Sequence, residues 1–197
     1  MPRVKTISDE AVLDAALNHL LEHGPHRFTL PAVGRAVGLA PATLLQRFGS
    51  KKGLLAHTLD RAAERLQAAS GEETDTADAR ADLVRWLVGL AVPFRSRAHV
   101  ASNLALLTDD LVDEKSRQRA TRHMQIVREG IARHLCRLGG SAAEVHVDLI
   151  EAQWHGLVIQ WALTGHGDCA AWVADGLATL LDAVVPAEVA VDRSGSA

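Results

Sequence analysis

The sequence predicts an all-α protein, with an N-terminal three-helix head of residues 1–52 and a helical-bundle body of residues 53–185. Two observations favour this fold class. Apolar residues recur at helical spacing through most of the chain, and the head carries helix start and stop signals without a strand pattern. The last segment, residues 186–197, is polar or small and is predicted to be a disordered tail.

The first helix is predicted to begin after Ser8 and to end at Gly24. Ser8 is a suitable N-cap, and Asp9 and Glu10 place negative charge in the first turn, where the helix dipole favours it. Glycine is the residue typical of helix C-termini.

Two short helices follow, joined by a turn that contains glycine. Thr29 is the predicted N-cap of the first, Gly38 ends it, and Pro41 opens the second, which runs to Phe48. This arrangement is typical of the helix-turn-helix motif, whose second helix, here called the recognition helix, enters the DNA major groove. The head is therefore predicted to bind double-stranded DNA.

Two lysines open the next helix, which is predicted from Lys51 to about Ala69 with Ser50 as its N-cap. Cations at this positive helix end are disfavoured by about 0.3–1 kcal/mol. Lys51 is therefore better explained if a DNA phosphate occupies the helix end. The alternative is that Lys51 and Lys52 are both solvated surface lysines.

The recognition helix also carries side chains that can read bases. Arg47 can fork onto guanine O6 and N7, Gln46 can pair with adenine N6 and N7, and the Thr43 methyl group can touch a thymine methyl group. For Gln46 the alternative is an ordinary solvent-facing glutamine. Leu44 and Phe48 are predicted to belong to the core of the head.

Charge is unevenly distributed along the chain. The net charge is −3, but residues 1–55 carry seven Lys and Arg against four Asp and Glu. The remainder carries fourteen against twenty. A basic head on an acidic body favours contact with DNA through the head.

The body is predicted to contain five further helices, at residues 79–96, 98–108, 114–138, 142–165 and 168–184. Pro93 is expected to break or kink the first of them. The last two carry broad apolar faces, which indicate a helical hairpin that pairs with a second copy of the chain in a homodimer. These faces comprise Leu149, Ala152, Gln153, Gly156, Leu157, Gln160 and Trp161, and then Trp172, Val173, Leu177, Leu180 and Leu181. The alternative is that the core of one subunit consumes both faces.

The body is also expected to bind a small-molecule effector in a pocket. Apolar walls with a few polar groups suit a small amphipathic or aromatic ligand. The candidate ligand-binding residues are Trp86, Phe94, Asn103, Leu107, Met124, Val127, Ile131, Trp154 and His155. The alternative for each is an ordinary core position. A ligand there is expected to tilt the helix of residues 51–69 and change the distance between the two recognition helices of a dimer.

The sequence gives little support to an enzyme or a metal site. His146 and His155 lie nine residues apart with Asp148 and Glu151 nearby, but they form no recognisable metal or catalytic motif. A phosphate-binding glycine loop and a nucleophile elbow are also missing from the sequence. We therefore expect no catalytic residue, no cofactor and no metal.

Location is predicted from two further features. No apolar run reaches transmembrane length and the N-terminus lacks the apolar core of a signal peptide, which indicates a cytoplasmic protein with no membrane partner. Cys136 and Cys169 lack metal-ligand spacing and are expected to be reduced thiols of the core.

A specific combination of motifs covers about residues 8–56. These motifs are Ala15-Ala16-Leu17, Gly24, Phe28-Thr29, Val33-Gly34, Val37-Gly38-Leu39, Thr43-Leu44, Phe48, Ser50-Lys51 and Leu54-Leu55. On these residues the head resembles the tetracycline-repressor (TetR) family of transcriptional regulators, whereas the body matches only in length and all-helical layout. The resemblance implies a dimer that binds a pseudo-palindromic operator, usually to repress, and that a small ligand in the body releases.

The resemblance also implies roles for single residues. Thr29 matches a residue that caps the second helix and contacts phosphate, and Lys51 matches the phosphate-binding lysine of the family. The exposed face of the recognition helix is implied to be Pro41, Ala42, Thr43, Gln46 and Arg47. Three residues depart from the family pattern: Leu45 replaces the usual tyrosine, Arg47 a frequent histidine or tyrosine, and Ala40 the usual hydroxyl cap.

The predicted function is therefore a ligand-responsive, sequence-specific repressor that works as a dimer. The alternative is a DNA-binding regulator without a small-molecule ligand, controlled by a protein partner.

Overall fold

The computed structural model describes residues 7–71, 78–138 and 144–184, and every regular element in these ranges is an α-helix. This confirms the predicted all-α fold. The helices are α1 (Asp9–His23), α2 (Leu30–Val37), α3 (Pro41–Phe48), α4 (Lys51–Gly71), α5 (Ala79–Ala91), α6 (Arg97–Val112), α7 (Glu114–Arg137), α8 (Glu144–Thr164) and α9 (Cys169–Val184). The predicted tail of residues 186–197 lies outside the described residues.

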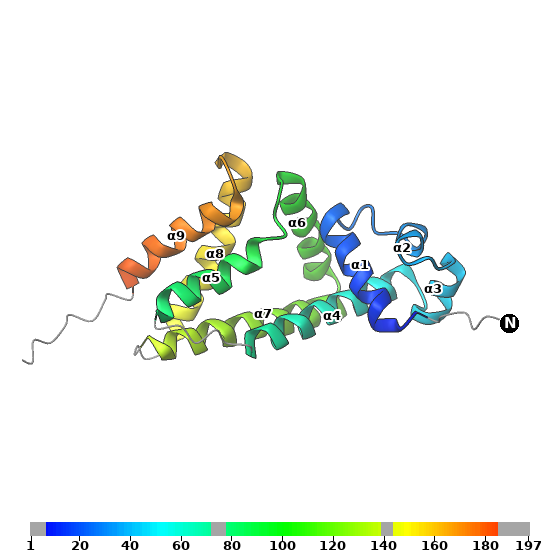
Figure 1. Ribbon diagram of the computed structural model, residues 1–197, viewed down its shortest axis with the longest axis horizontal. Coiled ribbons are helices and arrows are strands. Elements are labelled where there is room, and N and C mark those ends of the chain that lie inside the picture. The colour runs from blue at the N-terminus through cyan, green and yellow to red at the C-terminus, as the bar shows by residue number, and fades with distance from the viewer. Residues whose placement is uncertain (1–6, 72–77, 139–143, 185–197) are drawn as a thin grey trace, which may run out of the picture.

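The helices of the head gather at one end of an elongated molecule (Figure 1). There α1, α2 and α3 pack together, while α8 and α9 lie at the opposite end. Helix α4 leaves the head and runs beside α7 along the body. Because α4 is continuous, the head has no flexible linker to the body; its position depends on how α4 is held.

Local capping explains why the helices of the head begin and end where they do. Thr29 Oγ1 accepts a hydrogen bond from the Ala32 N–H at 3.2 Å, and Ser50 Oγ accepts one from the Gly53 N–H at 2.9 Å. Gly38 ends α2 in the left-handed conformation, with φ of 68°. These contacts confirm the predicted caps of α2 and α4.

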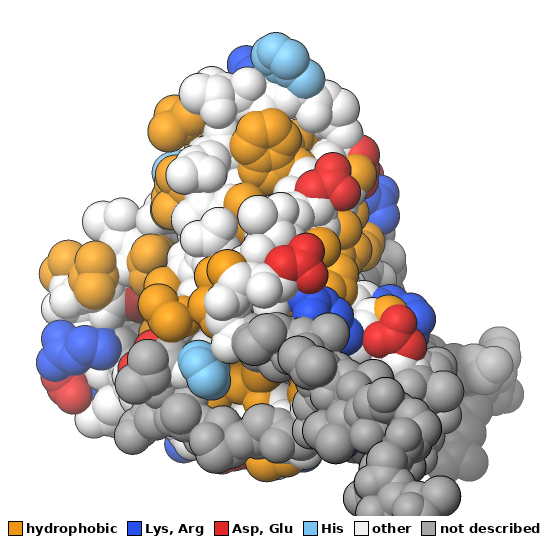
Figure 2. Space-filling model, turned by 90° about the vertical axis from the view of Figure 1, so that its left-hand side faces the viewer, with side chains coloured by type: hydrophobic (Ala, Val, Ile, Leu, Met, Phe, Trp, Pro, Cys, Tyr) orange, Lys and Arg blue, Asp and Glu red, His pale blue; other side chains and the backbone are white. Residues whose placement is uncertain are grey.

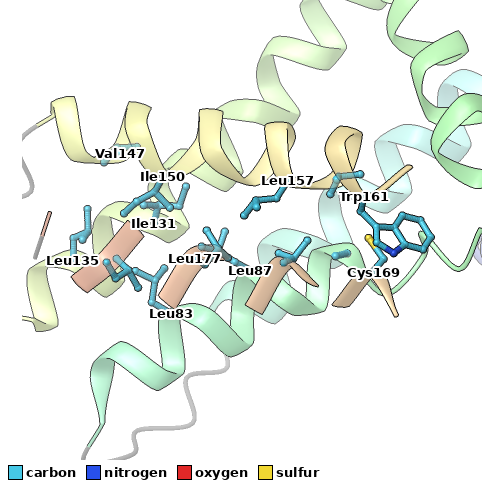
Figure 3. Packing of buried hydrophobic residues seen from close by; sticks show 14 of the residues in the cluster. Leu83, Leu87, Ile131, Leu135, Val147, Ile150, Leu157, Trp161, Cys169 and Leu177 are labelled. Carbon is cyan, nitrogen blue, oxygen red and sulfur yellow. The ribbon is translucent and has the colours of Figure 1, made fainter. Parts of the chain in front are cut away.

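Two separate clusters of buried apolar side chains hold the molecule together. The head cluster consists of Val12, Ala16, Leu20, Phe28, Val33, Leu44, Phe48 and Leu54. The body cluster brings together residues from α5 to α9, including Leu83, Leu87, Ile131, Leu135, Ile150, Leu157 and Leu177 (Figure 3). Leu44 and Phe48 are core residues of the head, as predicted.

The core of one subunit buries part of each apolar face that was predicted on the last two helices. On α9, Val173, Leu177 and Leu181 are fully buried within one subunit. On α8, Leu157 and Trp161 are also buried. For these five positions the alternative is correct, because the core of one subunit buries their side chains.

Ion pairs tie α4 to the helices on either side of it. Arg61 on α4 donates from Nε to Asp14 Oδ1 of α1 at 3.0 Å, and this hydrogen bond lowers the pKa of Asp14. Arg119 on α7 donates from Nε to Asp60 Oδ1 of α4 at 3.1 Å. Helix α4 is thus bonded both to the head and to the body.

A third ion pair links the start of α4 to the start of α7. Lys52 Nζ lies 2.8 Å from Asp113 Oδ1. The other carboxylate oxygen of Asp113 caps α7, because it accepts hydrogen bonds from the N–H and the hydroxyl of Ser116 at 3.0 and 2.8 Å. One carboxylate therefore both starts α7 and fixes the head end of α4.

We expect Asp113→Asn to lower the melting temperature at pH 7, because the amide keeps a cap acceptor but loses the charge that Lys52 faces. The hydrogen bonds from Lys52 and Ser116 lower the pKa of Asp113 below its usual value of 3.8. A carboxylate with a lowered pKa stabilises the fold above that usual value and loses this effect as the pH falls. The difference between wild type and variant should therefore be full at pH 7 and shrink below about pH 4.

Thermal unfolding followed by circular dichroism at several pH values measures this difference. The control is Glu129→Gln, which removes an exposed carboxylate elsewhere on α7. A difference for Asp113→Asn that persists unchanged at pH 3 would contradict the link.

Candidate functional site

The recognition helix α3 has an inner and an outer face. Leu44 and Phe48, one turn apart, are anchored in the head cluster. Ala42, Leu45 and Gln46 are exposed on the other side, and Leu45 is an unusual apolar residue there, with 48% of its surface open. The outer face can therefore offer a side-chain amide and apolar groups to the edges of bases.

The remaining predicted DNA-contact residues flank this face. Pro41 is exposed at the first position of α3, and Thr43 is half-buried. Thr29 is exposed at the start of α2, with its hydroxyl oxygen already engaged in the cap. Ala40 makes no side-chain cap, as its residue type predicts.

Arg47 is half-buried and paired within the head, and its predicted contact with DNA stays a prediction. Its guanidinium pairs with the Asp9 carboxylate of α1 and lies 5.7 Å from the centre of the Phe48 ring, and only 20% of its side chain is exposed. Arg47 can reach a guanine or a phosphate only by leaving Asp9. In this conformation it holds α3 against α1.

The two lysines at the start of α4 have different surroundings. Lys52 is committed to Asp113 of the body. Lys51 is exposed, and none of the ion pairs found among the described residues involves it. Its ammonium group and the N-terminal N–H groups of α4 can therefore act together on an anion such as a phosphate.

A cavity of about 640 Å³ lies where the head meets the body. Residues of α1 and α4 form one side of it, and residues of α5, α6, α7 and α8 form the rest. Seven of the nine predicted ligand-binding residues line it: Phe94, Asn103, Leu107, Met124, Val127, Trp154 and His155. This volume is within the range typical of small-molecule sites.

Trp86 and Ile131 lie outside that lining, so the structure does not bring them together with the other seven. Ile131 is fully buried in the body cluster. The Trp86 ring packs against Gly130, where an added Cβ would stand 2.3 Å from the indole, and against His134. Both are core positions, which was the alternative for each.

Helices α1 and α4 contribute lining residues that the sequence analysis did not identify. Leu17, Asn18 and Leu21 reach the cavity from α1, and Leu59 and Arg65 reach it from α4. The helical pattern of α1 marks which residues face inward, but not that α6 packs on the same helix. The sequence therefore carries no local signal for this part of the wall.

The two cysteines differ in their exposure. Cys169 is buried, and its burial raises the pKa of the thiol to about 11. Cys136 is exposed, so the prediction that it is a core thiol is wrong. Within residues 7–71, 78–138 and 144–184, no group of three His, Cys, Asp or Glu residues is arranged to hold a metal ion.

No helix in the described part of the chain is long and apolar enough to span a membrane.

Residues 12–58, from α1 to the first turns of α4, match the model of the family described as bacterial regulatory proteins, tetR family. No curated protein sequence matches the chain. Several solved structures share its fold over most of their length.

One is a transcriptional regulator from Saccharomonospora viridis in complex with choline, with 24% identity, coverage of 87% of this chain and 93% of that chain, and a TM-score of 0.65. Another is a TetR transcription regulator from Haloarcula marismortui ATCC 43049, with 19% identity, coverage of 87% and 95%, and a TM-score of 0.68. A third is a TetR transcriptional regulator from Legionella pneumophila, with 13% identity, coverage of 90% and 99%, and a TM-score of 0.68.

These structures agree with the chain in the all-α fold, and the head carries the family match. The resemblance drawn from the motifs of residues 8–56 is thus confirmed over residues 12–58, and the rest of the chain shares the fold of these regulators.

Proposed function

We propose that this protein is a repressor that binds a pseudo-palindromic operator as a homodimer and is released by a small amphipathic or aromatic molecule. The observation that carries the proposal is the cavity at the junction of head and body, because α1 and α4 contribute to its wall. A ligand there touches the helices that position the recognition helix. We also infer a cytoplasmic location, since that is where the operator DNA of a bacterium lies.

The exposed residues of the head suggest how it contacts DNA. Lys51 at the start of α4 and Thr29 at the start of α2 would contact phosphates and set the position of the head on the duplex. Ala42, Thr43 and Gln46 would face base edges in the major groove, with Pro41 at the entry of the helix. Arg47 would keep this face in place through Asp9.

Release would follow from the two-sided attachment of α4. Its ion pairs with Asp14 of α1 and Arg119 of α7 make α4 move with either neighbour. A ligand that favours one arrangement of the cavity by about 1–3 kcal/mol changes operator affinity by about 5–150-fold. The choline bound to the Saccharomonospora viridis regulator supports the idea that this fold can hold a small molecule.

The dimer would form through α8. Leu149, Ile159 and Leu163 are exposed, and with Ala152 and Gly156 they repeat at alternating intervals of three and four residues. This spacing gives a continuous apolar stripe along one face of a helix, as in helix pairs that pack against each other. Figure 2, seen from the end of the molecule that carries α8 and α9, shows hydrophobic side chains open on this side.

Selection of binding sites from a random duplex pool by the purified protein tests the proposed function. At near-physiological salt we expect enrichment of an inverted repeat, with half-sites about one helical turn apart or somewhat more. Two-fold symmetry of the protein should be mirrored in the operator. Salt-sensitive binding to all duplexes, without enrichment, would contradict sequence-specific regulation.

Lys51→Ala should weaken binding to the selected operator and to unrelated duplexes by a similar factor, because a phosphate contact carries no sequence information. The slope of log affinity against log salt should fall by about two units, one for each subunit of the bound dimer. Titrations at several salt concentrations measure both quantities. Arg133→Ala, which removes an equal charge from the exposed far end of α7, serves as the control and should leave binding unchanged.

Leu163→Asp should convert the dimer to a monomer, because it places a charge in the apolar stripe of α8. Leu163 is 73% exposed in one subunit. Sedimentation equilibrium reports the mass, and Leu111→Asp on α6, at a leucine that is 66% exposed, is the matched control and should remain dimeric. If Leu163→Asp stays dimeric, the interface lies elsewhere.

A further inference from the structure

One carboxylate in the wall of the cavity is incompletely bonded. Glu151 of α8 lines the cavity and is only 7% exposed. Its Oε2 accepts a hydrogen bond from Arg128 Nη1 at 3.1 Å, but its Oε1 is buried and has no hydrogen-bond partner among the described residues. A buried charged oxygen without a donor is costly, so this position favours a ligand that brings one.

The charge around Glu151 is also unbalanced. Arg128 pairs with the Asp148 carboxylate as well as with Glu151. One guanidinium thus faces two carboxylates, which leaves a net negative charge at this wall of the cavity.

The other arginines that line the cavity do not supply the missing charge. Arg119 is bonded to Asp60 at 3.1 Å, and Arg65 lies 3.6 Å from Asp14. Each therefore already has a carboxylate partner. The lining includes a further acidic residue, Asp110.

Two aromatic rings line the same cavity as Glu151. Trp154 is one helical turn further along α8, and its indole is fixed because Nε1 donates to the Leu87 carbonyl at 2.9 Å. The Phe94 ring lies 6.1 Å from it, centre to centre, and both residues line the cavity. The faces of fixed aromatic rings attract cations.

Two histidines, His123 and His155, also line the cavity. His155 Nδ1 lies 2.9 Å from the Glu151 carbonyl oxygen, which can only accept, so Nδ1 carries a proton. Desolvation, reinforced by His155, lowers the pKa of His123 below its ordinary value of 6.5, which disfavours a positive charge on this ring.

We propose that the cavity binds an organic cation, an ammonium group on an apolar body. The ammonium would pair with the Glu151 carboxylate and lie against the Trp154 and Phe94 rings, while the apolar body fills the space toward Leu107 and Met124. This inference rests on the proposed function and deepens it, because it names the chemical class of the effector.

The test compares three probes that share one apolar tail: octylammonium, octanol and octanoate. Calorimetric titration of the full-length protein at neutral pH should show octylammonium binding about tenfold or more tightly than octanol, which corresponds to one charge-assisted hydrogen bond. Octanoate should bind least well, because Glu151 repels it. Octanol or octanoate binding as tightly as octylammonium would overturn the inference, as would the absence of binding by all three.

Glu151→Gln should reduce the affinity for octylammonium about tenfold or more and change that for octanol by less than about twofold. Asp148→Asn is the matched control, since Asp148 lies on the same helix and pairs with the same arginine but does not line the cavity. It should lower the affinity for octylammonium clearly less than Glu151→Gln does, because it removes a neighbouring charge but not the proposed ligand contact, and it should leave that for octanol unchanged. Equal losses in the two variants would overturn the assignment to Glu151, and the probe comparison on wild-type protein stands even if a variant fails to fold.

Displacement of the protein from its selected operator separates this inference from the proposed function. If octylammonium binds through Glu151 but leaves DNA binding intact, the cation site stands and release by this ligand class is wrong. If octanol or octanoate binds preferentially and releases the operator, the ligand-responsive function stands and the cation site is wrong.

Discussion

Helix α4 packs against both the head and the body, and the rest of the structure depends on this constraint. Its first turns place Leu54 in the head cluster, and its middle faces α1 on one side and α7 on the other. Three ion pairs, made by Lys52, Asp60 and Arg61, fix it in both directions. Because α4 is a rigid element, any change in how the body holds it is passed to the recognition helix.

The sequence predicts the head almost completely because the relevant signals are local. Caps at Thr29 and Ser50, the glycine after α2 and the i, i+4 pair of Leu44 and Phe48 all act within a few residues of where they are read. Arg47 is the exception, since its partner Asp9 lies 38 residues earlier in the chain. A local pattern gives no information on such a pair between distant parts of the chain.

The cavity could be predicted only in part, for a related reason. Helical spacing marks the inward face of α5, α7 and α8, but the same spacing serves a filled core and an open wall. Trp86 and Ile131 therefore shared the pattern of the lining residues although they pack in the body cluster. The contribution of α1 to the cavity depends on how α6 lies against the head, which is a tertiary arrangement. Whether each carboxylate oxygen of Glu151 has a donor depends on the position of Arg128 on another helix.

The position of the cavity connects its chemistry with its proposed control of DNA binding. Arg119 and Arg65 line the cavity, and the same two arginines pair with carboxylates of α4 and α1. A charged ligand therefore enters a space bordered by the ion pairs that hold α4. Charges interact over distances of several ångströms, so a cation beside Glu151 would alter the balance of these pairs as well as the shape of the cavity. On this argument an ammonium group is more than an anchor for the ligand, because its charge acts on the contacts that set the position of the recognition helix.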